Sequence, residues 1–129
     1  LEVTLTGVPR NTFWCTVLGG DFFDSVTSLT LVGDRIDDSG LESLRLENIG
    51  CLTTLGLADT KVTSVGLQQL RELRSLQCLI IKRTPVTDVG LQHLRGLTNL
   101  ERLQLHDTQV TPVAVKKLQE ALPNCEIEY

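Results

Sequence analysis

Two histidines, four cysteines and several carboxylates are the residues of this 129-residue chain that could do chemistry. A nucleophilic catalytic site needs a histidine near a serine or cysteine, and a third group that orients the histidine. His93 and His106 are well separated, and neither suggests a Ser-His-Asp or Cys-His arrangement. We therefore predict that the chain is not an enzyme and uses no cofactor.

A metal site is the second kind of chemistry to consider. His106, Glu126 and Glu128 could converge on one ion, because His106 and Glu128 are expected at equivalent places on adjacent strands. One histidine with carboxylates on an open surface is weak zinc chemistry. We predict no metal site, and we expect His93 to be solvated on a helix.

The four cysteines could form disulfides, but the repeat register argues against most pairs. Cys51 and Cys78, like Cys78 and Cys125, are expected roughly 10 Å apart, beyond the limit of about 7 Å between bridged Cα atoms. Only Cys15 can find a partner, and Cys51 is left open as that partner. We expect Cys125 in the core, Cys78 on the surface, and at least two unpaired thiols. Unpaired thiols favour a reducing compartment such as the cytoplasm.

A 24-residue repeat is the frame that must position these residues. Three copies align without a gap, over residues 55–70, 79–94 and 103–118. A fourth copy, over residues 29–44, begins 26 residues before the next, and its two additional residues fall between Leu44 and Leu52. Such regular spacing predicts a stacked repeat protein.

Each copy changes its apolar period part of the way along. The first apolar residues are two apart, as in Leu55 and Leu57, which predicts a short strand with one buried face. The later ones are three apart, as in Leu67, Leu70 and Leu73, which predicts one face of a helix. Each copy is therefore a strand, a turn, a helix and a return loop, and successive strands lie parallel.

Polar residues mark the turn into each helix. Four of them are expected to cap the helix N-termini with their side chains: Asp37, Thr63, Thr87 and Thr111. The next residue suits the first helical position in three copies, as Asp38, Asp88 and Pro112, and less well in the fourth, as Ser64. A second threonine recurs before each cap, as Thr60, Thr84 and Thr108, and we expect its hydroxyl to bond the loop backbone of the neighbouring copy.

The two ends of the chain differ from the repeat. Residues 1–27 are predicted to form a divergent N-terminal capping repeat, with a strand at Val3 and Leu5 and a helix within residues 12–18. Residues 28–129 are predicted to be the repeats proper, closed by a capping strand in which Cys125 and Ile127 face the core. The two parts are expected to make one continuous domain.

Charge and hydropathy exclude two classes of partner. The net charge is -4 with both signs interspersed, so there is no basic stripe of the kind that nucleic acid requires. No run of about 20 apolar residues would insert into a bilayer, and no leader resembles a signal peptide. Because the chain starts at Leu1 and has no Met, we expect it to be a trimmed piece of a longer product.

The repeated pattern Leu-x-x-Leu-x-Leu-x-x-Thr-x-Val-Thr-Asp-x-Gly-Leu-x-x-Leu-x-x-Leu resembles the leucine-rich repeat family over residues 28–129. The stretch 86–91 is similar to the F-box-associated, cysteine-containing class. The threonine-containing repeats and the ending 121–127 resemble bacterial members, notably those of planctomycetes. The resemblance implies an α/β right-handed solenoid, with a short parallel sheet on its concave face and helices on its convex face. Ala114 and Val115 depart from the pattern, so the last helix is expected to begin differently.

The resemblance also implies a protein-binding module that uses the concave sheet. Fifteen side chains would line that face, small and neutral at the N-terminal end and charged at the other: Ser28, Thr30, Val32, Thr54, Gly56, Ala58, Cys78, Ile80, Lys82, Arg102, Gln104, His106, Asn124, Glu126 and Glu128. A sheet about 20 Å wide offers fewer residues than the roughly 20–30 of a standard interface. A tight partner would also need the loops at Asp34, Asp59, Arg83 and Asp107.

The function predicted from these positions is non-catalytic binding of another protein or peptide by a monomer. The binding residues would be Ile80, Lys82, Arg102, Gln104, His106 and Glu126. An exposed apolar residue between charges, as Ile80 would be, marks a contact site, but an ordinary solvated sheet face is the competing interpretation and stays open. The alternative function is a structural element that self-assembles through its end strands, although Glu126 and Glu128 would guard the last strand with charge.

Overall fold

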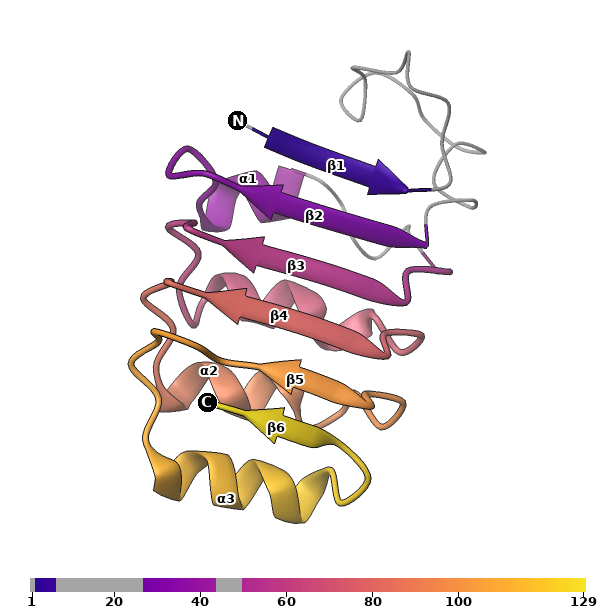
Figure 1. The fold of residues 1–129 in the computed structure, drawn as a ribbon, viewed down its shortest axis with the longest axis vertical. Helices are drawn as coiled ribbons and strands as arrows, with labels where there is room; N and C mark the ends of the chain where they lie inside the picture. Colours follow the sequence, from indigo (N-terminus) through magenta and orange to yellow (C-terminus); the bar gives the residue numbers. More distant parts are fainter. Residues whose placement is uncertain (1, 7–26, 44–49) are drawn as a thin grey trace.

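The structure is a computed structural model that describes residues 2–6, 27–43 and 50–129. One six-stranded sheet holds its strands in chain order, from β1 to β6. Figure 1 shows the helices behind one face of this sheet, and none of the described helices covers the other face. The strands β2 to β6 are parallel, as the repeat predicts, and β1 pairs antiparallel with β2.

The five parallel strands occupy the same place in each repeat: β2 Ser28–Val32, β3 Thr54–Ala58, β4 Cys78–Lys82, β5 Arg102–Gln104 and β6 Glu126–Glu128. Their inward residues stack in register, so that Leu29, Leu55, Leu79, Leu103 and Ile127 form one column. The side chains between them point to the open face because successive residues of a strand alternate. Two predicted strands are shorter than expected, since β5 ends before His106 and β6 begins after Asn124.

The helical segments of the middle repeats are short and partly of the 3₁₀ type. They are α1 Asp38–Ser43, η3 Gly66–Glu72, α2 Asp88–Leu91 and η4 Gln92–Leu94. The 3₁₀ helix has three residues a turn, so leucines spaced by three stay on one face. Leu67, Leu70 and Leu73 are spaced in this way, and all three are buried.

The last helix, α3 Pro112–Ala121, is a regular α-helix. Its buried residues Val115 and Leu118, and Leu122 directly after its end, are three and four apart, which is the spacing of an α-helical face. The side-chain amide of Gln119 donates to the carbonyls of Leu122 and Cys125, at 3.0 and 2.8 Å. The helix begins at Pro112, the repeat position at which α2 begins with Asp88, so the expectation that it begins differently is wrong. It differs in being longer and regular, and Gln119 satisfies two carbonyls at its C-terminal end.

The core is a leucine stack, as the composition predicts. The leucines of the strands and of the helical face are buried, and Ile36, Val62 and Val86 fill the layer beneath the turns. Burying one such side chain contributes about 1.5–3 kcal/mol. Cys125 joins this core with 3% of its surface exposed, which confirms the predicted inward orientation.

The strand β1, Glu2–Thr6, confirms the strand expected at Val3 and Leu5. Its direction differs from the repeat, because Val3 lies opposite Leu31 and Leu5 opposite Leu29 in an antiparallel pair. It is therefore not another copy of the parallel repeat strand. The helix expected within residues 12–18 lies outside the described residues, and most of the segment with the two additional residues falls on 44–49, also outside them.

Hydrogen bonds at the helix N-termini join neighbouring repeats. The Asp38 carboxylate accepts from the backbone N–H and the hydroxyl of Thr63, at 2.7 and 2.6 Å. Asp88 accepts in the same way from Thr111, at 2.7 and 2.8 Å. Between them, the Ser64 hydroxyl accepts from the Thr87 N–H at 3.1 Å and shares a hydrogen bond with its hydroxyl at 2.9 Å. The residue after each cap thus holds the cap of the next repeat, a role that the sequence did not suggest.

The expected caps are present in part. Asp37 accepts from the Gly40 N–H at 2.9 Å, and Thr111 accepts from the Ala114 N–H at 3.4 Å. Thr63 accepts instead from the nearer Val65 N–H at 3.1 Å. Thr87 makes no side-chain cap bond, because its hydroxyl bonds Ser64 of the preceding repeat.

The recurring turn threonines do not behave as predicted. Thr60 and Thr84 are buried, and their hydroxyls have no hydrogen-bond partner among the described residues. Thr108 donates to the carbonyl of Leu105 in its own copy, at 3.0 Å, and not to a neighbouring copy. The predicted bonds to the neighbouring copy are therefore not formed, and two of these hydroxyls are buried without a hydrogen bond.

Replacing Thr84 by valine should raise the free energy of unfolding by about 1 kcal/mol, because it removes an unpaired buried hydroxyl and keeps the shape. The matched change Thr108→Val should lower it by about 1 kcal/mol, because it removes a hydrogen bond. Urea denaturation of the two variants checks both signs. A loss of stability in Thr84→Val would show that its hydroxyl has a partner.

Candidate functional site

The open face of the sheet, formed by the outward side chains of β2 to β6, is the surface that the repeat leaves uncovered (Figure 1). Its N-terminal half, on β2 and β3, carries only small, uncharged side chains. Gly56 is buried because Thr30 leans over it, and a Cβ atom at Gly56 would lie 3.1 Å from Cγ2 of Thr30. Thr54 and Ala58 on either side are small, so no charged or bulky side chain projects from β2 and β3.

The C-terminal half of the open face carries longer side chains. Ile80, which the sequence predicts to be exposed, is half-buried on β4, as is Lys82. Arg102 on β5 and Glu126 on β6 are exposed. The register places Arg102 between Cys78 and Glu126. It places Gln104 between Ile80 and Glu128. The prediction that His106 and Glu128 occupy equivalent places is therefore wrong, because Glu128 lies opposite Gln104. The structure therefore brings together most of the residues that the sequence predicts as a binding patch, and it confirms the graded composition of the face.

Glu128 is held by two neighbours on the preceding repeat. The Gln104 amide donates to its Oε2 at 2.8 Å, and His106 Nε2 lies 3.5 Å from the same oxygen. Protonation of His106 would make the second contact an ion pair. Glu126 lies apart from this cluster, in the row of Arg102. Of the residues with described positions, no three His, Cys, Asp or Glu side chains are grouped as metal ligands.

The rim of the open face is formed by the turns that follow the strands. Four residues at the same place in successive repeats have a positive φ: Gly33, Asp59, Arg83 and Asp107, at 120°, 56°, 49° and 54°. Aspartate tolerates this left-handed conformation and glycine adopts it readily, but arginine rarely does. The N–H groups of Gly33, Asp59 and Arg83 extend the sheet ladder, as in the bond from Arg83 N to the carbonyl of His106 at 3.0 Å.

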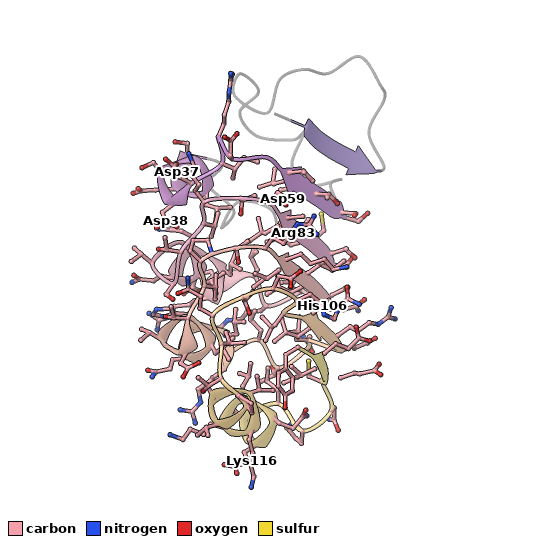
Figure 2. The ribbon with its side chains drawn as sticks, turned by 60° about the vertical axis from the view of Figure 1, so that its left-hand side comes forward. Asp37, Asp38, Asp59, Arg83, His106 and Lys116 are labelled. Carbon is pink, nitrogen blue, oxygen red and sulfur yellow. The ribbon has the colours of Figure 1, made fainter. Side chains whose placement is uncertain are left out.

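Arg83 is fixed by a carboxylate of the preceding repeat. Its Nε pairs with Oδ1 of Asp59, and its Nη2 donates to Oδ2 at 2.6 Å. The hydrogen bond from Arg83 lowers the pKa of the Asp59 carboxyl below its usual value, and the same bond raises the pKa of the guanidinium. Figure 2 shows Asp59, Arg83 and His106 following one another along the strand side, with Asp37 and Asp38 on the helix side.

The sequence placed these loop residues beside the predicted face but revealed neither the ion pair nor the backbone conformation. Gly33 is the signal that could have shown the conformation, because it stands at the repeat position of Asp59, Arg83 and Asp107. A glycine at one copy of a turn position indicates that the turn uses a positive φ there.

The other surfaces are less specific. A groove of about 460 Å³ between α2 and α3 is lined by residues of both charges, among them Arg95, Lys117 and Glu120. A polar groove at the starts of the strands is lined partly by Ser75 and Asn99, whose side chains donate to the preceding loop. Three exposed valines, Val65, Val89 and Val113, recur at one repeat position with 59–67% of their surface exposed. None of the helices in the described ranges has both the length and the apolarity to cross a bilayer.

The cysteines agree with the predicted register where the structure describes them. Cys78 lies half-buried on the open face and Cys125 lies in the core, and neither forms a disulfide. Burial raises the pKa of the Cys125 thiol to about 11, and Cys78 and Glu126 add to the shift. Cys15, the cysteine with an open pairing, is outside the described residues.

Comparisons with known proteins match the fold and not the sequence. Neither a family model nor a curated protein matches the chain. A leucine-rich-repeat protein of Leptospira interrogans is similar in structure, with a TM-score of 0.55 and 24% identity over 65% of this chain. An internalin of Listeria monocytogenes gives a TM-score of 0.47 and 17% identity over 64% of this chain. This chain covers 21% and 29% of those two proteins.

The first of these similarities, together with the parallel sheet and its covering helices, confirms the predicted fold class. The chain has the leucine-rich-repeat fold.

Proposed function

We propose that this leucine-rich-repeat solenoid is a non-catalytic module that binds another protein through its open face and the adjoining rim. The observation that supports the proposal most strongly is the setting of Ile80. It is an apolar side chain on the uncovered face of the sheet, with Lys82 beside it on β4 and Arg102 on the neighbouring strand. An apolar centre with a charged surround is the usual composition of a binding surface.

The rigidity of the surface also supports binding. Its side chains stand on strands in a fixed register, and Arg83 at the rim is held by Asp59. A surface that is already ordered loses less conformational entropy on association, so more of the contact energy contributes to affinity. The turns add area beyond the strands, which a face of this size needs to reach a standard interface.

The proposal extends to the organisation of the chain. Residues 28–129 would act as one continuous unit, with residues 1–27 as its N-terminal cap, in a monomer that binds a protein and not nucleic acid. The threonine-containing repeats would place it near the bacterial, planctomycete-type members or the F-box-associated class. The chain would be one module of a longer product, as its coverage of 21% of the Leptospira protein suggests.

Substitution of Ile80 and Arg102 together tests the proposal. The variant Ile80→Thr with Arg102→Ala should weaken the complex with the natural partner, captured from the source organism, by at least about tenfold, or roughly 1.4 kcal/mol. The matched control Val65→Thr with Arg95→Ala removes the same side-chain types from the helix side and should leave the affinity unchanged. Thermal unfolding should show similar stability for both variants. Unchanged affinity in the first variant would reject the open face as the site.

The alternative is self-assembly through the end strands. It is favoured by β6, which pairs with β5 on one side and is the last strand of the sheet on the other. The exposed Glu126 opposes such pairing, because charge on an edge strand disfavours addition of a further strand. Light scattering over a rising protein concentration separates the two functions, since a simple binding module should keep the mass of one chain.

A further inference from the structure

We propose that the open face recognises an extended acidic segment of its protein partner, in which two carboxylates flank an apolar residue. This inference rests on the proposed function and names the chemistry of the partner. It follows from which charges on the face are already paired, and from the spacing of those that are not.

Several charged groups near the face already have a partner within the chain. Asp59 and Arg83 pair with each other at the rim. Glu128 accepts from Gln104 and lies beside His106. A charge that is already paired gains little from a second partner, because the new contact must compete with the existing one. These groups therefore position the surface more than they attract a ligand.

The two remaining cations flank Ile80. Neither Lys82 nor Arg102 has an ion pair with any residue that the structure describes. Lys82 is two residues beyond Ile80 on β4, and Arg102 stands opposite Cys78, two residues before Ile80. The two cations are thus four residues apart along the strand direction and one strand apart across the sheet. The separation of their Cα atoms is roughly 13–14 Å from strand geometry.

An extended segment matches this spacing. Its residues i and i+4 are roughly 13 Å apart, and residues i, i+2 and i+4 point to the same side. Aspartate or glutamate at i and i+4 would reach Lys82 and Arg102, while an apolar residue at i+2 would lie on Ile80. The N-terminal half of the face, formed by β2 and β3, leaves room for the rest of the partner, because no charged side chain projects there.

Glu126 offers a test of whether the bound segment is acidic or basic. It lies directly opposite Arg102 on the neighbouring strand, and no described residue forms an ion pair with it. Its carboxylate competes with an acidic ligand for the guanidinium and repels that ligand. Removing the charge at Glu126 should therefore tighten the binding of an acidic segment, whereas it would weaken the binding of a basic one.

A library of random 12-residue peptides displayed on phage, selected on the full chain, supplies the probes. Enriched peptides should carry acidic residues four apart with an apolar residue midway. Fluorescence anisotropy then measures the affinity of synthetic versions of these peptides for the chain. The affinity should be about tenfold lower for Lys82→Gln with Arg102→Gln and about threefold higher for Glu126→Gln. Added salt should lower it. The control Lys61→Gln with Arg95→Gln removes two exposed cations that lie off the face and should leave affinity nearly unchanged.

The outcomes separate this inference from the proposed function. Some peptides could bind the wild-type chain and bind the variant Ile80→Thr more weakly. If such peptides are basic, or if Lys82→Gln with Arg102→Gln does not change their affinity, the acidic specificity is overturned while the face remains a binding site. A selection that yields no peptide, or only peptides indifferent to both sets of substitutions, would contradict the proposed function as well.

Discussion

Replacing Gly66 by alanine is expected to lower the free energy of unfolding by about 2–3 kcal/mol, although only one methyl group is added. A Cβ atom at Gly66 would overlap Oδ1 of Asp38 and lie 2.9 Å from Cγ1 of the buried Val62. The Asp38 carboxylate cannot move aside cheaply, because it accepts two hydrogen bonds from Thr63. Urea denaturation monitored by circular dichroism gives the change.

Two further variants test the cause of this loss. Gly96→Ala should cost nothing or stabilise slightly, because no atom lies within 4 Å of a Cβ there. In an Asp38→Ala background the Gly66→Ala change should cost at least about 1 kcal/mol less, since the overlapping carboxylate is gone. Strict additivity of the two changes would show that Asp38 does not pass over Gly66.

Alkaline pH should destabilise the chain through Cys125. Burial raises the pKa of this thiol from its ordinary value of 9.0 to about 11, so the unfolded chain loses the thiol proton first. Between these two pH values the folded state binds more protons, and the free energy of unfolding falls as the pH rises. The loss should approach about 1.4 kcal/mol per pH unit within that window, to an upper limit of about 2.7 kcal/mol once the pH exceeds both values.

The variant Cys125→Ala isolates this effect from the titration of other groups. Urea denaturation in a reducing buffer, at steps from pH 8 to pH 10.5, should show the wild-type chain losing stability faster than the variant. At pH 8 the wild-type chain should be the more stable of the two, because the variant leaves a small void in the core. Parallel loss in both chains would contradict the assigned thiol.

The strands were the most predictable part of the fold. Period-two leucines such as Leu55 and Leu57 face the core in register, because burying one face of a strand determines the position of every second residue. The helical type was less predictable. Leucines three apart indicate a helical face of either type. The one sign of the 3₁₀ form is that the spacing of three continues without a step of four, as from Leu67 to Leu73.

The direction of β1 and the joints between repeats could not be predicted. Val3 and Leu5 alternate equally well in a parallel or an antiparallel strand, because alternation carries no direction. Asp38 and Asp88 suit the first turn of their own helices through the helix dipole. Only the three-dimensional stacking shows that each reaches the cap of the next repeat.

The positions of the candidate-site residues on β4 and β5 followed from the repeat, but the register of Glu126 on β6 and the electrostatics did not. Ile80, Lys82, Arg102 and Gln104 stand on the strands where the register put them. Whether a charge is paired depends on side-chain reach between repeats, as with Arg83 and Asp59. The assignment of these residues to binding stays a prediction.

Neighbouring repeats are joined at their helix N-termini by hydrogen bonds of unequal strength; each such contact is called a joint here. In a linear array each repeat is stabilised mainly by its two neighbours, so the weakest contact decides where the array comes apart first. The outer two joints use the carboxylates of Asp38 and Asp88, and charge-assisted bonds are about twice as strong as neutral ones. The middle joint uses the neutral hydroxyl of Ser64. At the rim, the pair of Arg83 with Asp59 joins the same two repeats, so the repeats of β3 and β4 have their charge-assisted contact on the strand side instead of the helix side.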